Sequence, residues 1–315
     1  MKIVVVDAYT LNPGDLSWDK IAGLAEIKLF DRTSPAELID RCTGADIILT
    51  NKVAFDKRIL EQLPDLKLIV VTATGYNIID TEAAREKKIS VCNVPDYGTD
   101  SVAQHTFAFI LELVNQVGTH SSSVHQGDWV KSPDFSYSLT PLTELKDKTI
   151  GFVGFGSIGR RTAEIAKAFG MRVLYHTPQK KDTDLGEYRD LNSIFIESDF
   201  VSLHVPLKVE NKGFVNKNLI EKMKKNAFLI NTARGQLVNE QDLADALNSG
   251  RIAGAALDVL STEPPQANNP LLGANNCIIT PHNAWMSKEA RIRIMEITLE
   301  NIKAFLNGEP INLVN

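Results

Sequence analysis

The sequence predicts an α/β protein with two doubly wound parallel sheets. Short apolar runs alternate with helical patterns along the chain, and this alternation is typical of parallel sheets covered by helices on both faces. The 315 residues are enough for two ordinary domains. A hydrophobic content of 43% can fill both cores.

The first part of the chain supplies the strands of one sheet, which we expect at residues 2–6, 26–30, 45–50, 66–72 and 89–93. Open parallel sheets bind ligands beyond the carboxyl ends of their strands. Asn51 follows one of these strands, and Ala73, Thr74 and Gly75 follow another. The second loop can present consecutive N–H groups to a carboxylate, although a plain strand-to-helix turn that requires Gly75 explains the same residues.

A long helix is expected from residue 99 to about residue 117, because its apolar residues are spaced for one buried face. Residues 118–147 then lack a clear pattern and contain Trp129, Pro133 and Pro141. A loop of this length is usually functional or packed on a partner. We therefore interpret the region as an irregular arm or a contact between subunits.

The second series of strands begins at residues 149–153 and leads into Gly154, Gly156 and Gly159. This spacing fits the G-x-G-x-x-G pattern of dinucleotide-binding turns, provided that a strand precedes it and a helix follows it. An apolar helical face after the glycines meets the second condition. The alternative is a glycine-rich turn without a ligand.

Five more strands are expected in this series, at residues 172–176, 200–205, 227–232, 253–259 and 277–280, which makes six in all. Polar residues follow three of these strands: Arg234, Asp258 with Glu263, and His282. Reduction of a keto acid needs a cation for the carboxylate, a proton donor for the developing alkoxide and a partner for that donor. Each residue alone also has a structural interpretation, but together on one rim they favour catalysis.

Several motifs resemble those of the D-isomer-specific 2-hydroxyacid dehydrogenases: NTARG (231–235), ALDV (256–259) with Glu263, and TPH (280–282). Residues 10–15, 127–129 and 282–285 are similar to the glycerate dehydrogenase (hydroxypyruvate reductase) branch. The resemblance implies a Rossmann nucleotide-binding domain, residues 99–287, inserted in a flavodoxin-like substrate domain, residues 1–98 and 288–315.

The same resemblance implies roles for individual residues. His282 is the acid or base, Glu263 orients it, and Arg234 binds the keto acid. The implied cofactor contacts are Gly154, Phe155, Gly156, Ser157, Ile158, Gly159, His176, Thr177, His204, Val205, Pro206, Thr232, Ala233 and Asp258. The expected substrate contacts are Asn51, Ala73, Thr74, Gly75 and Trp285.

The sequence does not match the usual pattern at the position that decides between NAD(H) and NADP(H). An Asp or Glu about 20 residues after the glycines normally binds the adenosine ribose. This chain has His176 and Thr177 there, followed by Lys180 and Lys181. We favour NAD(H), because the glycerate branch commonly uses it, and NADP(H) stays open.

Composition excludes other classes. The net charge of −5 and the lack of a basic block argue against nucleic-acid binding. The N-terminal apolar run is too short for a signal or a membrane span, and the three cysteines lack metal-site spacing, so we expect a cytoplasmic protein without a metal. The resemblance and the arm suggest a homodimer.

Proteins of the same fold with other functions are the alternatives to a keto acid reductase. Formate oxidation produces no alkoxide, so a Glu263–His282 pair has less purpose in a formate dehydrogenase. A phosphoglycerate enzyme calls for a basic cluster that we do not find in the first domain. A dinucleotide-sensing scaffold, similar to corepressors of this fold, is the alternative from a different class. It would bind cofactor without turnover of a keto acid.

Overall fold

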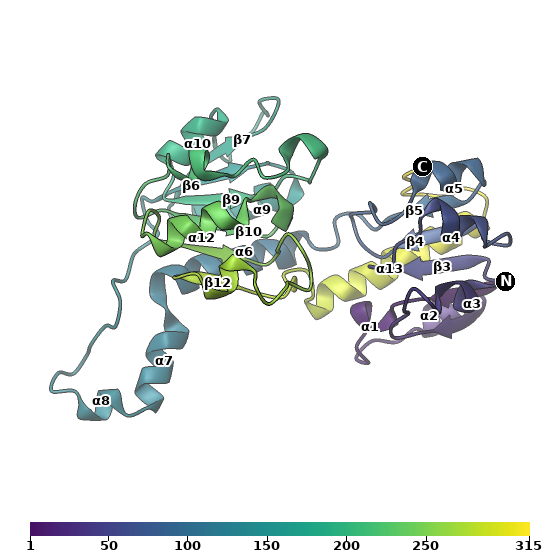
Figure 1. The fold of residues 1–315 in the computed structure, drawn as a ribbon, viewed down its shortest axis with the longest axis horizontal. Coiled ribbons are helices and arrows are strands. Elements are labelled where there is room, and N and C mark those ends of the chain that lie inside the picture. The colour runs from purple at the N-terminus through teal and green to yellow at the C-terminus, as the bar shows by residue number, and fades with distance from the viewer. The chain divides into compact units, whose positions relative to one another are not determined.

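The computed structural model describes all residues from 1 to 315, which fold into two compact units (Figure 1). Unit 1 contains Met1–Tyr97 and Met286–Asn315, and unit 2 contains Gly98–Trp285. The chain therefore leaves unit 1 once, forms unit 2 and returns. The predicted class of two parallel-sheet α/β domains, one inserted in the other, is confirmed.

Unit 1 has a five-stranded parallel sheet in the order β2-β1-β3-β4-β5. This order is the flavodoxin-like one. The strands are β1 (Lys2–Val5), β2 (Glu26–Leu29), β3 (Ile47–Thr50), β4 (Leu68–Val71) and β5 (Ser90–Cys92). The helices are α1 (Ala8–Leu11), α2 (Asp19–Ala22), α3 (Leu38–Cys42), α4 (Lys57–Glu61), α5 (Thr81–Glu86) and α13 (Lys288–Leu306). All residues of β3 and β4 are buried, as expected for the centre of such a sheet.

The C-terminal tail completes unit 1 by covering the edge strand β5. The N–H of Val314 donates to the Val91 carbonyl at 2.9 Å, and the N–H of Asn93 donates to the Asn312 carbonyl at 3.1 Å. An uncovered strand edge is a template for aggregation, so this pairing protects the sheet.

Unit 2 has a seven-stranded parallel sheet in the order β12-β11-β10-β9-β6-β7-β8. The strands are β6 (Thr149–Val153), β7 (Arg172–His176), β8 (Glu187–Tyr188), β9 (Phe200–Leu203), β10 (Phe228–Asn231), β11 (Gly254–Leu257) and β12 (Cys277–Ile279). The predicted number of six was wrong. The missed strand, β8, has only two residues and pairs with β7 at the edge, so it carries no apolar pattern of its own.

Helices cover this second sheet. They are α6 (Thr99–Asn115), α9 (Ser157–Ala168), α10 (Leu191–Glu197), α11 (Lys217–Ile220) and α12 (Glu240–Asn248), with short 3-10 turns at η1 (Val209–Asn211), η2 (Gly235–Leu237) and η3 (Pro270–Gly273). The order of the strands places β6 between β7 and β9, where the connections reverse direction. Dinucleotides bind at this switch point in doubly wound sheets. No helix of the protein combines the length and the apolar character that crossing a membrane requires.

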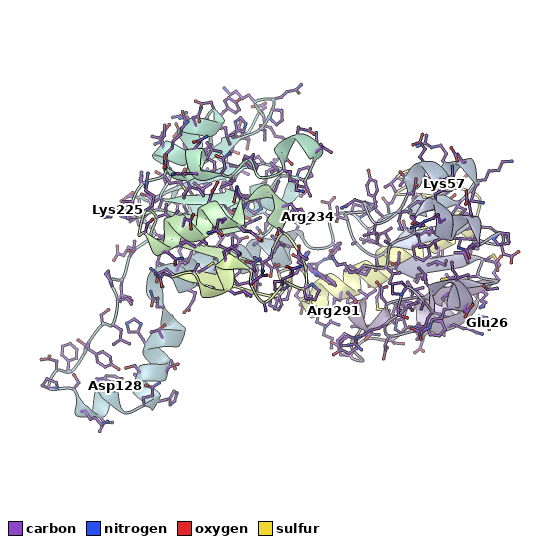
Figure 2. The ribbon with its side chains drawn as sticks, in the orientation of Figure 1. Glu26, Lys57, Asp128, Lys225, Arg234 and Arg291 are labelled. Carbon is purple, nitrogen blue, oxygen red and sulfur yellow. The ribbon has the colours of Figure 1, made fainter.

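The arm, defined as residues 117–147, extends from the rest of unit 2 (Figure 1). We expected it to be irregular, but it contains the helices α7 (Val117–His125) and α8 (Asp128–Lys131). These helices bury only Ser123, so they have no apolar face for the sequence to reveal. Polar bonds hold them instead, including one from the N–H of Leu139 to Nε2 of His120 at 3.1 Å. Asp128, labelled in Figure 2, lies in this arm.

Candidate active site

The sequence-predicted site residues of unit 2 follow the carboxyl ends of its strands. His282 follows β12, Asp258 follows β11 and Arg234 follows β10. His204 follows β9, Gly154 follows β6, and His176 ends β7. All these strands are parallel, so their ends meet at one edge of the sheet. Arg234 is labelled in Figure 2.

Each of the three glycines in the turn after β6 has a different steric role. Gly154 has a φ of +96°, and a Cβ there would lie 2.4 Å from the His204 carbonyl oxygen. A Cβ on Gly159 would lie 2.7 Å from the Gly154 oxygen, so this residue lets the helix approach the strand. Gly156 differs, because a Cβ there would meet no protein atom within 4 Å. Because Gly156 has no side chain, the space beside the turn stays open, and no other part of the protein fills it.

That open space adjoins the N-terminus of α9. Gly156 is the N-cap of α9, and no side chain caps the helix. The N–H groups of the first turn have no partner inside a helix, and the helix dipole favours an anion beside them. The turn therefore fits the pyrophosphate of a dinucleotide. The candidate contacts Phe155, Ser157 and Ile158 lie in the same turn.

Charged residues of both signs, including Asp182 and Glu187, lie near the end of β7. Nδ1 of His176 lies 3.1 Å from the Arg189 carbonyl oxygen, to which it donates a hydrogen bond. A cavity of about 660 Å³ nearby is lined by Lys180, Lys181 and Arg189 among others. The Arg189 guanidinium is already paired with Glu187 and Glu197, at 2.8 and 3.2 Å. Thr177 is buried and donates its hydroxyl to the Gln179 carbonyl at 2.6 Å.

His204 follows β9, which lies between β10 and β6 in the sheet. Its Nε2 is 2.8 Å from the Ser202 hydroxyl. Burial lowers the pKa of His204 to about 4, so this imidazole is neutral near neutral pH. Val205 is half-buried and Pro206 is exposed. An uncharged imidazole suits contact with a ligand better than it suits proton transfer at that pH.

The loop after β10 fixes the Arg234 backbone. The Asn231 side chain bonds both the N–H of Ala233, at 3.0 Å, and the carbonyl of Arg234, at 2.9 Å. Next in the chain, a Cβ on Gly235 would lie 1.9 Å from the Leu260 carbonyl carbon. The Arg234 loop therefore packs directly, backbone to backbone, on the loop that follows β11. Thr232 is half-buried, and its hydroxyl lies 3.4 Å from that of Thr106.

Glu263 and His282 form a close pair. Glu263 Oε2 lies 2.6 Å from Nδ1 of His282, and the two side chains are 35% and 24% exposed. The carboxylate accepts, so Nδ1 donates and Nε2 is the nitrogen left to face a ligand. The other oxygen of Glu263 accepts from the Leu260 N–H at 3.1 Å. The carboxylate is thus fixed from one side and orients the imidazole on the other.

The candidate substrate residues lie mostly in unit 1. Asn51 is 3% exposed and donates from its amide to the Thr72 carbonyl at 2.7 Å, while its Oδ1 has no partner. The Thr74 hydroxyl donates to the Val94 carbonyl at 3.0 Å. The N–H of Val94 donates to the Ala73 carbonyl at 3.1 Å. The loop that contains Gly75 is therefore attached to the chain beyond β5.

Trp285 is the last residue of unit 2 and is 8% exposed. Its Cβ would lie 3.8 Å from a Cβ built on Gly98. Its expected contact with substrate stays a prediction.

Comparison with known proteins identifies the family. Residues 107–284, more than half of the chain, match the family described as D-isomer specific 2-hydroxyacid dehydrogenase, NAD binding domain. The chain is also 47% identical, over the full length of both proteins, to a hydroxypyruvate reductase of Blautia hydrogenotrophica. It belongs to the D-isomer specific 2-hydroxyacid dehydrogenase family. This dehydrogenase is therefore an oxidoreductase of small 2-hydroxy and 2-keto acids.

Two further proteins resemble the dehydrogenase. A glycerate dehydrogenase of Methylorubrum extorquens is 40% identical, with 92% of each chain covered. The solved structure of an acyclic imino acid reductase, in complex with NADPH and D-arginine, has a TM-score of 0.89 and 33% identity, with both chains covered completely. The family description names NAD and this structure holds NADPH, so the likeness is compatible with either cofactor.

Sequence reasoning missed several residues that shape the dehydrogenase site. Gly235 lies in a motif that we quoted, but its contact with Leu260 bridges two loops distant in sequence. Thr280 was quoted only as part of a motif, yet its hydroxyl donates to Asp258 at 2.6 Å. Asp258 itself is 2% exposed and also accepts from two backbone N–H groups. A buried carboxylate needs several hydrogen-bond donors. The feature of the sequence that indicated Asp258 was its position directly after a strand.

The open space beside Gly156 leads to a first prediction. Gly156→Ala should weaken NADH binding by about tenfold or more, because the methyl group occupies space that the pyrophosphate needs. The melting temperature should stay unchanged, since no protein atom lies within 4 Å of that Cβ. Fluorescence titration with NADH and thermal melting measure the two quantities.

Gly273→Ala is the matched control, because a Cβ there also meets nothing within 4 Å and Gly273 lies in η3, outside the glycine turn. It should alter neither quantity. Unchanged NADH affinity in Gly156→Ala would show that the cofactor does not approach this turn.

Proposed function

We propose that the dehydrogenase reduces hydroxypyruvate to D-glycerate, with glyoxylate and other short 2-keto acids as further substrates. The observation that carries the proposal is the 2.6 Å contact between Glu263 and His282, because it leaves one imidazole nitrogen free to protonate a carbonyl oxygen. Support for this substrate comes from the relatives named hydroxypyruvate reductase and glycerate dehydrogenase.

Arg234 is the residue that we assign to the keto acid. Its guanidinium presents planar donors that match a carboxylate and a neighbouring carbonyl oxygen. One of them, Nη1, donates to the Ala233 carbonyl at 2.7 Å, which holds the side chain near its own loop. The remaining donors are available for the substrate. A fixed cation of this kind orients the carbonyl and stabilises negative charge that develops on its oxygen.

His282 is the proton donor of the reduction and the base of the reverse reaction. The bound nicotinamide supplies or accepts the hydride. As negative charge develops on the substrate oxygen, Nε2 of His282 gives up its proton, and Glu263 stabilises the charged imidazole before that transfer. In the reverse direction the same nitrogen removes the hydroxyl proton. The pair therefore serves both directions without a metal ion.

The two units take different roles in this proposal. We assign cofactor binding to unit 2, because the glycine turn and Asp258 lie there. We assign part of substrate recognition to unit 1, through Asn51 and the loop of Ala73, Thr74 and Gly75. The N–H groups of Thr74 and Gly75 donate to no acceptor within the chain, which suits them to a carboxylate.

A second prediction separates chemistry from binding. His282→Ala should lower kcat by at least about 100-fold and leave NADH affinity nearly unchanged, since the imidazole acts in proton transfer. Arg234→Ala should mainly raise KM for hydroxypyruvate and lower kcat/KM. Steady-state kinetics with NADH and a fluorescence titration provide these values.

Two exposed residues offer matched controls: His125→Ala on α7 and Arg58→Ala on α4, both of which should behave like the natural enzyme. Near-normal turnover in His282→Ala or Arg234→Ala would contradict the assignment. Cofactor binding by the natural protein, without turnover of hydroxypyruvate, glyoxylate or pyruvate, would instead favour the scaffold.

We further propose NAD(H) as the cofactor used by preference. An arginine is the usual partner of the additional phosphate of NADP, and Arg189 near the end of β7 is already paired with two carboxylates. His176 stands where an acidic residue would repel that phosphate, so discrimination against NADP(H) is expected to be incomplete.

The third prediction concerns His176. His176→Asp should raise the ratio of kcat/KM for NADH to that for NADPH by about tenfold or more, because a carboxylate accepts from the ribose hydroxyls and repels a 2′-phosphate. Gln179→Asp adds the same charge at an exposed position outside β7 and should change the ratio less. An unchanged ratio in His176→Asp would place the adenosine ribose elsewhere.

We propose that the enzyme is a homodimer in which the arm contacts the second copy. The arm exposes large apolar side chains: Val130 and Phe135 are each 90% exposed, and Trp129 is 52% exposed. Exposed apolar residues gathered in one segment are typical of interaction sites. A closed dimer with two-fold symmetry is the commonest assembly that such a surface forms.

The fourth prediction tests this surface. The double variant Val130→Asp with Phe135→Asp should sediment as a monomer, because two buried charges would oppose the contact. The double variant Gln62→Asp with Asn248→Asp, which adds two charges at exposed positions outside the arm, is the control and should remain dimeric. A natural protein that sediments as a monomer at micromolar concentration would contradict the dimer.

We also assign the enzyme to the cytoplasm. Its three cysteines, Cys42, Cys92 and Cys277, are free thiols. Burial raises the pKa of each thiol, to about 11 for Cys92 and about 12 for the other two, which keeps them protonated and unreactive. Unpaired cysteines are usual in a reducing compartment.

A further inference from the structure

The turn that carries His282 has an unusual backbone. His282 has a φ of +53°, in the left-handed region that residues other than glycine rarely adopt. Its N–H donates to the carbonyls of Asp258, at 2.8 Å, and Thr280, at 3.0 Å. Such a conformation persists only where the surroundings enforce it. The contacts on both sides of His282 therefore decide how its imidazole is aimed.

The Asp258 carboxylate holds the turn on both sides. Oδ1 accepts from the Thr280 hydroxyl at 2.6 Å and from the Asn283 N–H at 2.9 Å. Oδ2 accepts from the Ala284 N–H at 3.0 Å. Thr280 precedes His282, and Asn283 and Ala284 follow it, so one buried carboxylate closes the turn around the imidazole.

Helix α6 contacts the same turn at two points. The Ser101 hydroxyl donates to the Ala284 carbonyl at 2.6 Å. One turn of helix further on, Nε2 of His105 lies 3.1 Å from the Thr280 hydroxyl oxygen. Ser101 and His105 are four residues apart and therefore lie on one face of α6. This face contacts the turn both before and after His282.

The direction of the His105 bond follows from the donors available. The hydroxyl of Thr280 has one proton, and its shortest contact, to the Asp258 carboxylate, requires that proton because the carboxylate only accepts. Nε2 of His105 must therefore carry a proton and donate to Thr280. The bonds form a chain that runs from His105 through Thr280 to Asp258.

His105 is fixed in its own right. Its ring packs edge-on against Phe109, with 4.5 Å between ring centroids. Burial lowers the pKa of His105, although the Asp258 carboxylate at 3.8 Å opposes this effect. The neutral and the charged imidazole both donate from Nε2, so the chain of bonds does not depend on which form is present. The charged residues of α6, Asp100 and Glu112, play no part in it.

We propose that His105 and Ser101 are positioning residues of the active site, which act through Thr280 and Ala284 to hold His282 in line with Glu263. Helix α6 acts on the turn through the bonds of these two residues to Ala284 and Thr280. Its effect is to keep the turn closed, so that the reactive nitrogen is correctly aimed in most molecules. The proposal rests on the proposed role of His282 as proton donor.

Substitutions at both ends of the His105 bond test the chain. His105→Leu and Thr280→Val should each lower kcat with hydroxypyruvate by about 10-fold to 100-fold, because small misplacements of reacting groups have effects of this size. In His105→Leu the affinity for NADH and the melting temperature should change little, whereas Thr280→Val should also lower the melting temperature, because it removes a donor to the buried Asp258 carboxylate. His105→Gln keeps a donor at the position of Nε2, and Thr280→Ser keeps the hydroxyl, so both should recover most of kcat.

The double variant distinguishes one chain of bonds from two separate contributions. If His105 acts only through Thr280, His105→Leu combined with Thr280→Val should be no slower than the slower single variant. Gln104→Leu, an exposed neighbour on the same helix, is the matched control and should keep the natural kcat. Independent, multiplicative losses would overturn the proposal, as would natural turnover in His105→Leu.

A readout without turnover separates this proposal from the proposed function. The amides of Asn283 and Ala284 should exchange hydrogen faster in His105→Leu than in the natural protein or in Gln104→Leu, with other amides unaffected. Faster exchange at these two amides would support the positioning role of His105 even if hydroxypyruvate proved not to be a substrate. Unchanged exchange at both amides, or a loss of kcat that follows a general loss of stability and is not recovered by His105→Gln, would overturn it.

Discussion

The proposed chemistry depends on one interaction, the hydrogen bond between Glu263 and His282. At 2.6 Å it determines which imidazole nitrogen is committed to the protein and which is left for a substrate. Each partner is secured by its own surroundings. Glu263 is bonded to the Leu260 N–H, and His282 is held in a left-handed conformation by the backbone oxygens of Asp258 and Thr280.

The parallel sheet of unit 2 explains why these groups meet. Each strand leads into a loop at the same edge, so the order of the strands sets the order of the candidate site residues along that edge. From β12 to β6 the loops carry His282, Asp258, Arg234, His204 and Gly154, and His176 ends β7. Neighbouring strands lie about 4.8 Å apart, so His282, the proposed proton donor, and His176, the proposed adenosine contact, are separated by several strand spacings. An extended dinucleotide fits such an arrangement.

Local patterns in the sequence were sufficient for most of the fold and for the position of the candidate residues after the strands of unit 2. Strand alternation predicted two parallel sheets, and the glycine spacing predicted the turn after β6, where Gly154 has a positive φ. The roles of Arg234, Glu263 and His282 came from motifs and stay proposals. The edge strand β8 and the helices of the arm escaped prediction because neither buries an apolar face.

The contacts that position the site could not be predicted, because they join distant residues. His105 and Thr280 are 175 residues apart in sequence, and nothing in the local pattern around either indicates the other. The left-handed backbone of His282 is equally hidden, since its N–H is bonded to the carbonyl of Asp258, which belongs to another loop. Gly235 shows the same limit: its need for a missing Cβ depends on Leu260, which belongs to another loop.

The state of the His282 ring tests the central claim most directly. Nitrogen-15 NMR of the histidine-labelled enzyme, assigned with His282→Ala, reports which ring nitrogen carries the proton. The account predicts that the neutral ring of His282 is protonated at Nδ1, with Nε2 unprotonated, and that Glu263→Gln alters this pattern. A neutral His282 protonated at Nε2 in the natural enzyme, unaffected by Glu263→Gln, would contradict it.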